Sequence, residues 1–273
     1  MTETEQPSVL AEIDDAGVAW VTLNRPHLNN AYDGDMVQRL LDGVGALAAN
    51  DAVRVIVIRG AGKHFQAGAD LAWLNRVRTG TPEENLAVSE RTTDAVRALD
   101  ACPKPTVALV HGACFGGGTG IIAACDVVIA ADNAIFSIAE VRWGLHAGPI
   151  IPQLATAMGA RHVRRYAITA ERFDAKVACE LGLVHITCAH EQLESEGARV
   201  IDAILQNGPS AVAATKRILF ESQGLYIDDA TAHRLAADHS AQRQTVEAEE
   251  GLLSFAEKRA AKWYTKNTSV ILS

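Results

Sequence analysis

The first half of the chain alternates between short β-branched runs and segments in which apolar side chains recur at helical spacing. Five apolar runs predict strands, at residues 18–24, 53–59, 106–110, 127–130 and 134–138. Helical spacing predicts helices over 35–47, from residue 71 onward, over 90–99 and over 121–125. This order predicts an α/β fold of stacked ββα or βαβ units around a largely parallel sheet.

The pattern becomes helical after Gly208-Pro209, with predicted helices over 211–220, 230–248 and 252–263. We therefore divide the chain into an α/β core, residues 1–205, and a helical C-terminal region, residues 206–273. The polar stretch at 78–85 contains Gly80 and Pro82, and it predicts a mobile loop that enters a helix.

Composition excludes several classes of protein. The 273 residues are 48% hydrophobic, enough for a sizeable core, and the net charge of -8 argues against nucleic-acid binding and anionic membranes. The sequence lacks the ~18 consecutive apolar residues of a membrane span. The acidic, polar N-terminus, MTETEQPSV, does not resemble a secretory signal. The five cysteines form no C-x-x-C pair, so we expect free thiols in a cytoplasmic protein.

The segment Gly112–Gly120, G-A-C-F-G-G-G-T-G, lies between two apolar runs, where a strand should give way to a helix. The N–H groups at a helix N-terminus lack intrahelical partners, and the helix dipole is positive there. Glycines also leave those N–H groups unscreened by side chains. The segment therefore predicts a site for negative charge, either on a bound phosphate or on an oxygen that becomes negative during a reaction.

Two interpretations of the glycines compete. The segment Phe65–Leu71 also places a glycine turn before a helix, and two N–H donors that converge on one oxygen form an oxyanion hole. Alternatively, Gly118-x-Gly120-x-x-Ala123 fits the dinucleotide fingerprint, with Glu140 as its acid, and would indicate an oxidoreductase. Glu140, however, lies beyond two further predicted strands, and no Lys-Ser/Thr follows the glycines as in a P-loop.

Together, segments 65–71, 111–126 and 136–144 resemble the crotonase, or enoyl-CoA hydratase/isomerase, superfamily. Segments 23–31 and 255–259 resemble the N-terminal and C-terminal signatures of that family. The resemblance implies a crotonase-like spiral of stacked ββα units with an α-helical C-terminal trimerisation region. It also implies an acyl-CoA thioester substrate, a homotrimer or dimer of trimers, no metal, and no cofactor beyond the coenzyme A of the substrate.

The resemblance also implies roles for individual residues. The N–H groups of Ala69 and Gly117 would form the oxyanion hole, Glu140 would be the general acid/base, and Gly148 would shape the site beside it. Lys258 would approach the phosphates of coenzyme A. The remaining residues expected to line the CoA pocket are His27, Leu28, Ala67, Asp70 and Leu71.

Many hydratases of this family carry two glutamates, and the position of the first is Gly120 in this chain. The one remaining carboxylate, Glu140, could activate water for hydration or move a proton along an acyl chain as an isomerase. We favour hydration and keep isomerisation, and a non-catalytic acyl-CoA binder, as alternatives. Whether Glu83 or Glu84 supplies a second acid stays open.

A finer resemblance favours hydratases of branched glutaconyl-CoA substrates, which carry a second, free carboxylate. It depends on segments 68–73, 119–120, 140–142 and 257–263. Arg142 could bind that carboxylate, because a guanidinium suits its geometry, or it could form a structural salt bridge. His146-Ala147-Gly148-Pro149 stands where the family often has a glycine-rich run, which leaves the exact substrate open.

Overall fold

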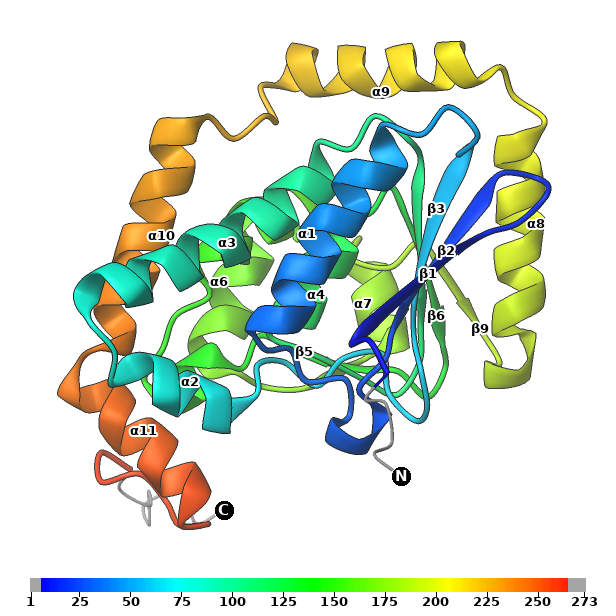
Figure 1. The fold of residues 1–273 in the computed structure, drawn as a ribbon. Coiled ribbons are helices and arrows are strands. Elements are labelled where there is room, and N and C mark those ends of the chain that lie inside the picture. Colours follow the sequence, from blue (N-terminus) through cyan, green and yellow to red (C-terminus); the bar gives the residue numbers. More distant parts are fainter. Residues whose placement is uncertain (1–5, 265–273) are drawn as a thin grey trace, which may run out of the picture.

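A computed structural model describes residues 6–264, and residues 1–5 and 265–273, the outer ends of the predicted core and C-terminal region, lie outside it. The main sheet has the strand order β1-β2-β3-β4-β6-β9 (Figure 1). Its strands are β1 (Val9–Ile13), β2 (Val18–Leu23), β3 (Val55–Gly60), β4 (Thr106–Val110), β6 (Val127–Ala131) and β9 (Ile186–Cys188). Only β1 and β2 pair antiparallel, so the predicted largely parallel sheet is confirmed.

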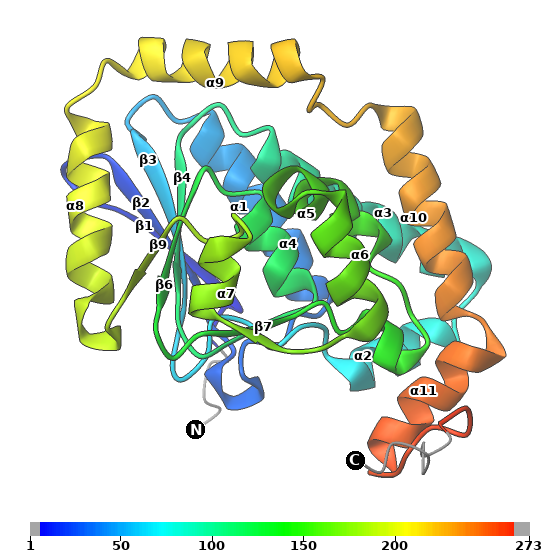
Figure 2. The same cartoon turned by 180° about the vertical axis from the view of Figure 1, so that it is seen from behind.

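Both faces of this sheet are buried. Alternate strand residues, such as Val57 and Leu109, pack against α8 (Leu193–Leu205) on one face. Their neighbours, such as Ile58 and Val110, belong to the larger core on the other face. Figure 2 shows α8 on one side of the sheet and the helices of the larger core on the opposite side. The helices of that core are α1 (Gly34–Ala48), α3 (Pro82–Asp100), α4 (Gly117–Ala123), α5 (Ile151–Met158), α6 (Ala160–Thr169) and α7 (Ala175–Glu180).

A second, smaller sheet carries the chain toward the glycine segment. It consists of β5 (Ala113–Phe115), β7 (Ile135–Ser137) and β8 (Phe173–Asp174), with β5 and β7 parallel. Because Phe115 pairs with Ser137, the segments that follow these two residues leave the sheet side by side. The glycine triplet and Glu140 lie in those two segments.

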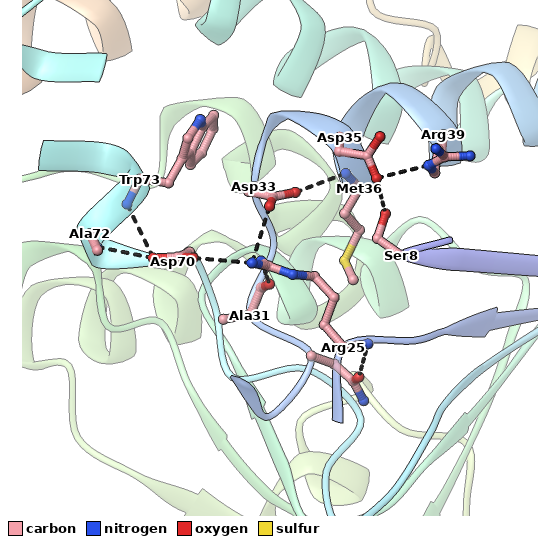
Figure 3. A network of polar contacts seen from close by, with 11 residues as sticks. Ser8, Arg25, Ala31, Asp33, Asp35, Met36, Arg39, Asp70, Ala72 and Trp73 are labelled. Carbon is pink, nitrogen blue, oxygen red and sulfur yellow. Dashed lines mark hydrogen bonds and ion pairs between the residues drawn. The ribbon is translucent and has the colours of Figure 1, made fainter. Parts of the chain in front are cut away.

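The N-terminal signature has a structural role (Figure 3). The guanidinium of Arg25, just before the short helix η1 (Pro26–Leu28), lies 3.1 Å from a carboxylate oxygen of Asp33 and 3.3 Å from one of Asp70. Asp33 accepts a backbone N–H at the start of α1, and Asp70 does so at the start of α2 (Leu71–Arg78). Arg25 therefore joins the N-termini of two helices.

Asn30 holds the adjoining loop from within. Its side chain is fully buried, and its Nδ2 donates to the carbonyl oxygens of Ala61, His64 and Phe65 at 2.8, 2.8 and 3.2 Å. Its Oδ1 accepts the backbone N–H of Arg25 at 2.8 Å. One amide side chain thus satisfies four backbone groups that no regular element pairs, which fixes the loop before Ala69.

The C-terminal region is helical as predicted, with α9 (Pro209–Gln223), α10 (Asp229–Arg243) and α11 (Val246–Ala256). The predicted continuous helix over 230–248 is wrong, because Thr245 accepts the Ala248 N–H and begins a new helix. The predicted helix over 252–263 is also wrong, since α11 ends at Ala256 and Lys258 has a left-handed φ of 52°. Helix α10 packs on α3, and α11 packs on α2 and on η2 (Glu140–Trp143).

Two other boundaries differ from prediction. Helix α3 begins at Pro82, because Thr81 and Glu84 form a reciprocal capping box, so only residues 79–81 separate α2 from α3. Helix α4 begins at Gly117, four residues earlier than predicted. The remaining elements are η3 (Gly148–Ile150) and η4 (His190–Gln192). Between residues 6 and 264, no helix is long and apolar enough to cross a membrane.

Replacing Asn30 should destabilise the fold. Asn30→Asp keeps the shape of the side chain but puts a carboxylate oxygen where an NH₂ group now donates to three carbonyls. We expect the free energy of unfolding to fall by about 3 kcal/mol in urea titrations. Asn50→Asp is the matched control, because its Oδ1 acceptor bond to the Ala52 N–H survives, and an equal loss in both variants would contradict the assignment.

Candidate active site

A cavity of about 590 Å³ opens between the two glycine turns, η2, η3 and helices α3 and α10. Three predicted catalytic residues line it, namely Ala69, Gly117 and Glu140. So do four of the predicted CoA contacts: Leu28, Ala67, Asp70 and Leu71. His27, Gly148 and Lys258 are not in its wall, although each is next to, or within three residues of, a residue that is.

The two glycine turns pack directly on each other. Gly116 follows β5 and precedes α4 with φ 49° and ψ -120°, a backbone conformation that side chains strongly disfavour. A Cβ on Gly116 would lie 2.9 Å from Oε1 of Glu140, and one on Gly118 would lie 3.1 Å from the carbonyl oxygen of Gln66. At Gly68 a Cβ would make only ordinary contact with the carbonyl of Phe115, but the φ of 91° is one that side chains rarely adopt. Glycine is therefore favoured by close contact at Gly116 and Gly118 and by backbone conformation at Gly68.

Each turn presents one free backbone donor to the cavity. The N–H groups beside Ala69 are used, since Gly68 donates to Gln66 Oε1 and Asp70 donates to the carbonyl of Tyr32. The N–H groups of Ala69 and Gly117 have no acceptor within residues 6–264. Both residues line the cavity, and Gly117 is the first residue of α4, where the helix dipole is positive. This arrangement can stabilise negative charge on a ligand oxygen.

Glu140 has a buried carboxyl group with no ion-pair partner among the described residues. It is the first residue of η2, and its Oε2 is buried without a hydrogen-bond partner within the described chain. Burial raises the pKa of Glu140 to about 7, although the backbone N–H groups of Glu140 and Ala139 oppose the shift. A carboxyl group with this pKa exchanges its proton readily near neutrality, as a general acid/base must.

Ile150 occupies the space that a side chain at position 120, the expected position of a second glutamate, would need. A Cβ on Gly120 would overlap Cγ2 of Ile150 and would lie 2.7 Å from its Cβ. Neither Glu83 nor Glu84 lines the cavity, and the Glu84 carboxylate accepts the Thr81 N–H at 2.8 Å. The cavity wall has one other acidic residue, Asp70, which is paired with Arg25. Among the residues described, Glu140 is thus the one unpaired carboxyl group of the site.

Within residues 6–264, Arg142 does not form the structural salt bridge that we considered from the sequence. It lines the cavity, and its Nε and one terminal nitrogen donate to the carbonyl of Ala170 at 3.2 and 2.8 Å. Arg172 also lines the cavity and lies over the ring of Phe115 at 5.2 Å.

Sequence reasoning assigned no role to several polar residues of the wall, among them Tyr32, His146 and His239. The pKa of the Tyr32 hydroxyl is raised by burial and by the nearby charge of Glu140, which places Tyr32 close to the acid/base. No local motif marks either histidine, because they meet only when α10 packs on η3.

The sequence pattern of the enoyl-CoA hydratase/isomerase family matches residues 14–266. The chain belongs to this family. It is 32% identical to a mitochondrial Delta(3,5)-Delta(2,4)-dienoyl-CoA isomerase of Dictyostelium discoideum, over 92% of this chain and 88% of that protein. It is 31% identical to a crotonyl-CoA hydratase of Syntrophomonas wolfei, over 91% of this chain and 95% of that protein. Family membership confirms the resemblance found in the sequence.

The fold agrees with this assignment. A crystal structure of an enoyl-CoA hydratase from Shewanella pealeana superposes with a TM-score of 0.77 at 35% identity, covering 94% of this chain and 96% of that one. The dinucleotide fingerprint gains no support, because Gly118 and Gly120 lie within α4 rather than in the turn before it. The family membership and the fold thus favour the oxyanion-hole interpretation.

The buried Glu140 should make stability depend on pH. Its folded pKa, about 7, lies above the ordinary value of 4.5, so its contribution is full below pH 4.5 and is lost as the pH rises through 7. Glu140→Gln has no proton to lose. We expect the unfolding free energy of the wild type, relative to this variant, to fall by about 2 kcal/mol between pH 5 and pH 8. Parallel pH profiles in denaturant titrations would contradict the assignment.

Proposed function

We propose that this enzyme is a hydratase, which adds water across the double bond of an enoyl-CoA thioester. The proposal depends on one cavity that holds both the Glu140 carboxyl group and the backbone N–H groups of Ala69 and Gly117, none of which has an ion-pair or acceptor partner among the described residues. Neither feature alone would define a reaction. Together they supply an acid/base and a site for developing negative charge, the two things that hydration of a thioester requires.

The reaction would proceed as follows. The ionised Glu140 takes a proton from water as the water oxygen bonds to Cβ of the substrate. The electron pair of the double bond moves toward the thioester oxygen, and the N–H groups of Ala69 and Gly117 stabilise the resulting enolate. Glu140 then returns its proton to Cα. Backbone donors fixed in advance stabilise the transition state more than the substrate, because the charge develops only there.

Isomerisation is the second candidate, and the single carboxyl group also suits it. One glutamate can remove a proton from one carbon of the acyl chain and return it to another, with the same enolate between the two steps. The similarity to a dienoyl-CoA isomerase favours this alternative specifically. The two reactions differ in one respect that can be measured, since only hydration changes the mass of the thioester.

We further propose how the substrate is held. Leu28, Ala67 and Leu71 would contact coenzyme A, with His27 beside Leu28 and Asp70 ordering the loop. Exposed Lys258 would approach the phosphates, because it follows α11, whose Phe255 lines the cavity. Coenzyme A would act as part of the substrate, with no separate cofactor and no metal. Ala147 and Pro149 line the cavity on either side of Gly148, so Gly148 would shape the site from behind its wall.

We also propose a homotrimer or a dimer of trimers as the working assembly. The exposed apolar side chains of α9 support it, since Ile218 is 55% and Leu219 54% exposed and burial between subunits would remove them from water.

Glu140→Gln should abolish hydration while leaving substrate binding intact. We expect the hydration rate to fall by about 10²–10⁴-fold, because glutamine cannot exchange protons. In the wild type, kcat/KM should rise with pH and level off above about pH 7, since the ionised carboxylate is the active form. Mass spectrometry of a panel of enoyl-CoA thioesters at several pH values measures both effects.

Glu83→Gln is the control for this experiment, because Glu83 lies outside the cavity, in the first turn of α3. Its hydration rate should equal that of the wild type. Undiminished hydration by Glu140→Gln would contradict the proposal, and so would wild-type turnover that rearranges a double bond without adding the mass of water.

A further inference from the structure

Two histidines stand together in the cavity wall where α10 meets η3. His146 precedes η3, His239 belongs to α10, and their ring centroids are 5.8 Å apart. Both line the cavity, yet the proposed hydration does not use either of them. The groups that surround the two rings indicate what they could bind.

Hydrogen bonds set the proton position on each ring. The backbone N–H of Gly148 donates to Nδ1 of His146 at 3.0 Å, and the Arg243 guanidinium donates to Nδ1 of His239 at 3.2 Å. Since Nδ1 accepts in both cases, a neutral ring carries its proton on Nε2. Neither Nε2 has a protein partner within residues 6–264, and neither is a fully buried unpaired atom. Two N–H donors are therefore available to a ligand.

A buried positive charge lies behind His239. Arg243 has no exposed surface, and no carboxylate pairs with it within the described residues. Its terminal nitrogens bond to Ser89 Oγ at 2.7 Å and to the Asn85 carbonyl at 3.4 Å, and its Nε has no partner in that part of the chain. An unpaired buried charge is costly, and an anion bound nearby would offset that cost.

His239 itself stays uncharged in this setting. Burial, Arg243 and His146 all lower the pKa of the His239 ring, so near neutral pH it donates a hydrogen bond without adding a second charge. The hydroxyl of Tyr32, another group close to Arg243, is neutral near pH 7, and burial raises its pKa further above the ordinary value. Arg243 thus places a positive charge directly behind the His239 ring.

We propose that His146 and His239, backed by Arg243, form a subsite for a carboxylate on the acyl chain of the substrate. The inference rests on the proposed function and narrows it to enoyl-CoA thioesters that carry a second, free carboxylate. His146 and His239 would donate to the carboxylate oxygens. Arg243 is a positioning residue, since it fixes the His239 ring and supplies charge without lining the cavity. The proposed subsite does not include Arg142, which also lines the cavity and directs its Nε and one terminal nitrogen to the carbonyl of Ala170.

Binding of unreactive thioesters tests the subsite without requiring turnover. Glutaryl-CoA and pentanoyl-CoA have acyl chains of five carbons, and one ends in a carboxylate where the other ends in a methyl group. By isothermal titration calorimetry, the wild type should bind glutaryl-CoA more tightly. His239→Leu should weaken glutaryl-CoA binding by about 10–100-fold and change pentanoyl-CoA binding by less than about threefold. His239→Gln should restore part of the difference, because its amide can donate near the position of Nε2.

His233→Leu is the matched control, since His233 lies on the same helix, exposed, and pairs with Glu90 outside the cavity. It should bind both thioesters as the wild type does. Equal losses for both thioesters in His239→Leu would overturn the subsite, as would a wild type that prefers pentanoyl-CoA. If His239→Leu does not fold, His146→Leu serves instead, because His146 is only half-buried. If the wild type does not hydrate any enoyl-CoA but still binds glutaryl-CoA more tightly than pentanoyl-CoA, the proposed reaction is wrong and the carboxylate subsite is supported.

Discussion

The contact between two glycine turns is the constraint on which this active site depends. A Cβ on Gly118 would lie 3.1 Å from the carbonyl oxygen of Gln66 in the other turn, and one on Gly116 would lie 2.9 Å from Oε1 of Glu140. Side chains there would displace the facing turn or the Glu140 carboxyl group. The close approach of the two turns brings the unpaired N–H groups of Ala69 and Gly117 to one cavity and leaves Glu140 beside them. The small sheet that pairs Phe115 with Ser137 and the buried Asn30 both act to hold this contact in place.

The site concentrates groups that the fold would be more stable without. Glu140 keeps a buried oxygen without a partner, Arg243 has no counter-ion within the described chain, and two backbone donors face an open cavity. Regular packing elsewhere offsets these costs, in two hydrophobic layers on either side of a largely parallel sheet. Residues that bind or react commonly lower the free energy of unfolding of a protein. The fold tolerates this loss because the rest of the structure is well packed.

The local pattern of apolar residues predicts most of the longer strands and helices. The short strands and the contacts between distant residues depend on tertiary packing. The runs that became β2, β3, β4 and β6 were predicted within about two residues, because buried parallel strands are continuous apolar segments. Strands β5, β8 and β9 have two or three residues each and β1 is an exposed edge, so none shows a period. Glycine spacing and resemblance predicted Ala69, Gly117 and Glu140 as one site, and all three line the cavity. His146 and His239 are 93 positions apart, so the sequence does not show that their rings meet. It also does not show that Ile150 fills the space beside Gly120, because that contact is tertiary.

The central claim is that two backbone N–H groups polarise the thioester carbonyl of the substrate. Isotope-edited infrared spectroscopy of an enoyl-CoA labelled with ¹³C at that carbonyl, bound to Glu140→Gln, measures this directly because the variant does not turn the substrate over. We expect a carbonyl band at lower frequency than in free solution, since hydrogen bonds from Ala69 and Gly117 weaken the C=O bond. A bound thioester whose band stays at the solution frequency would contradict it.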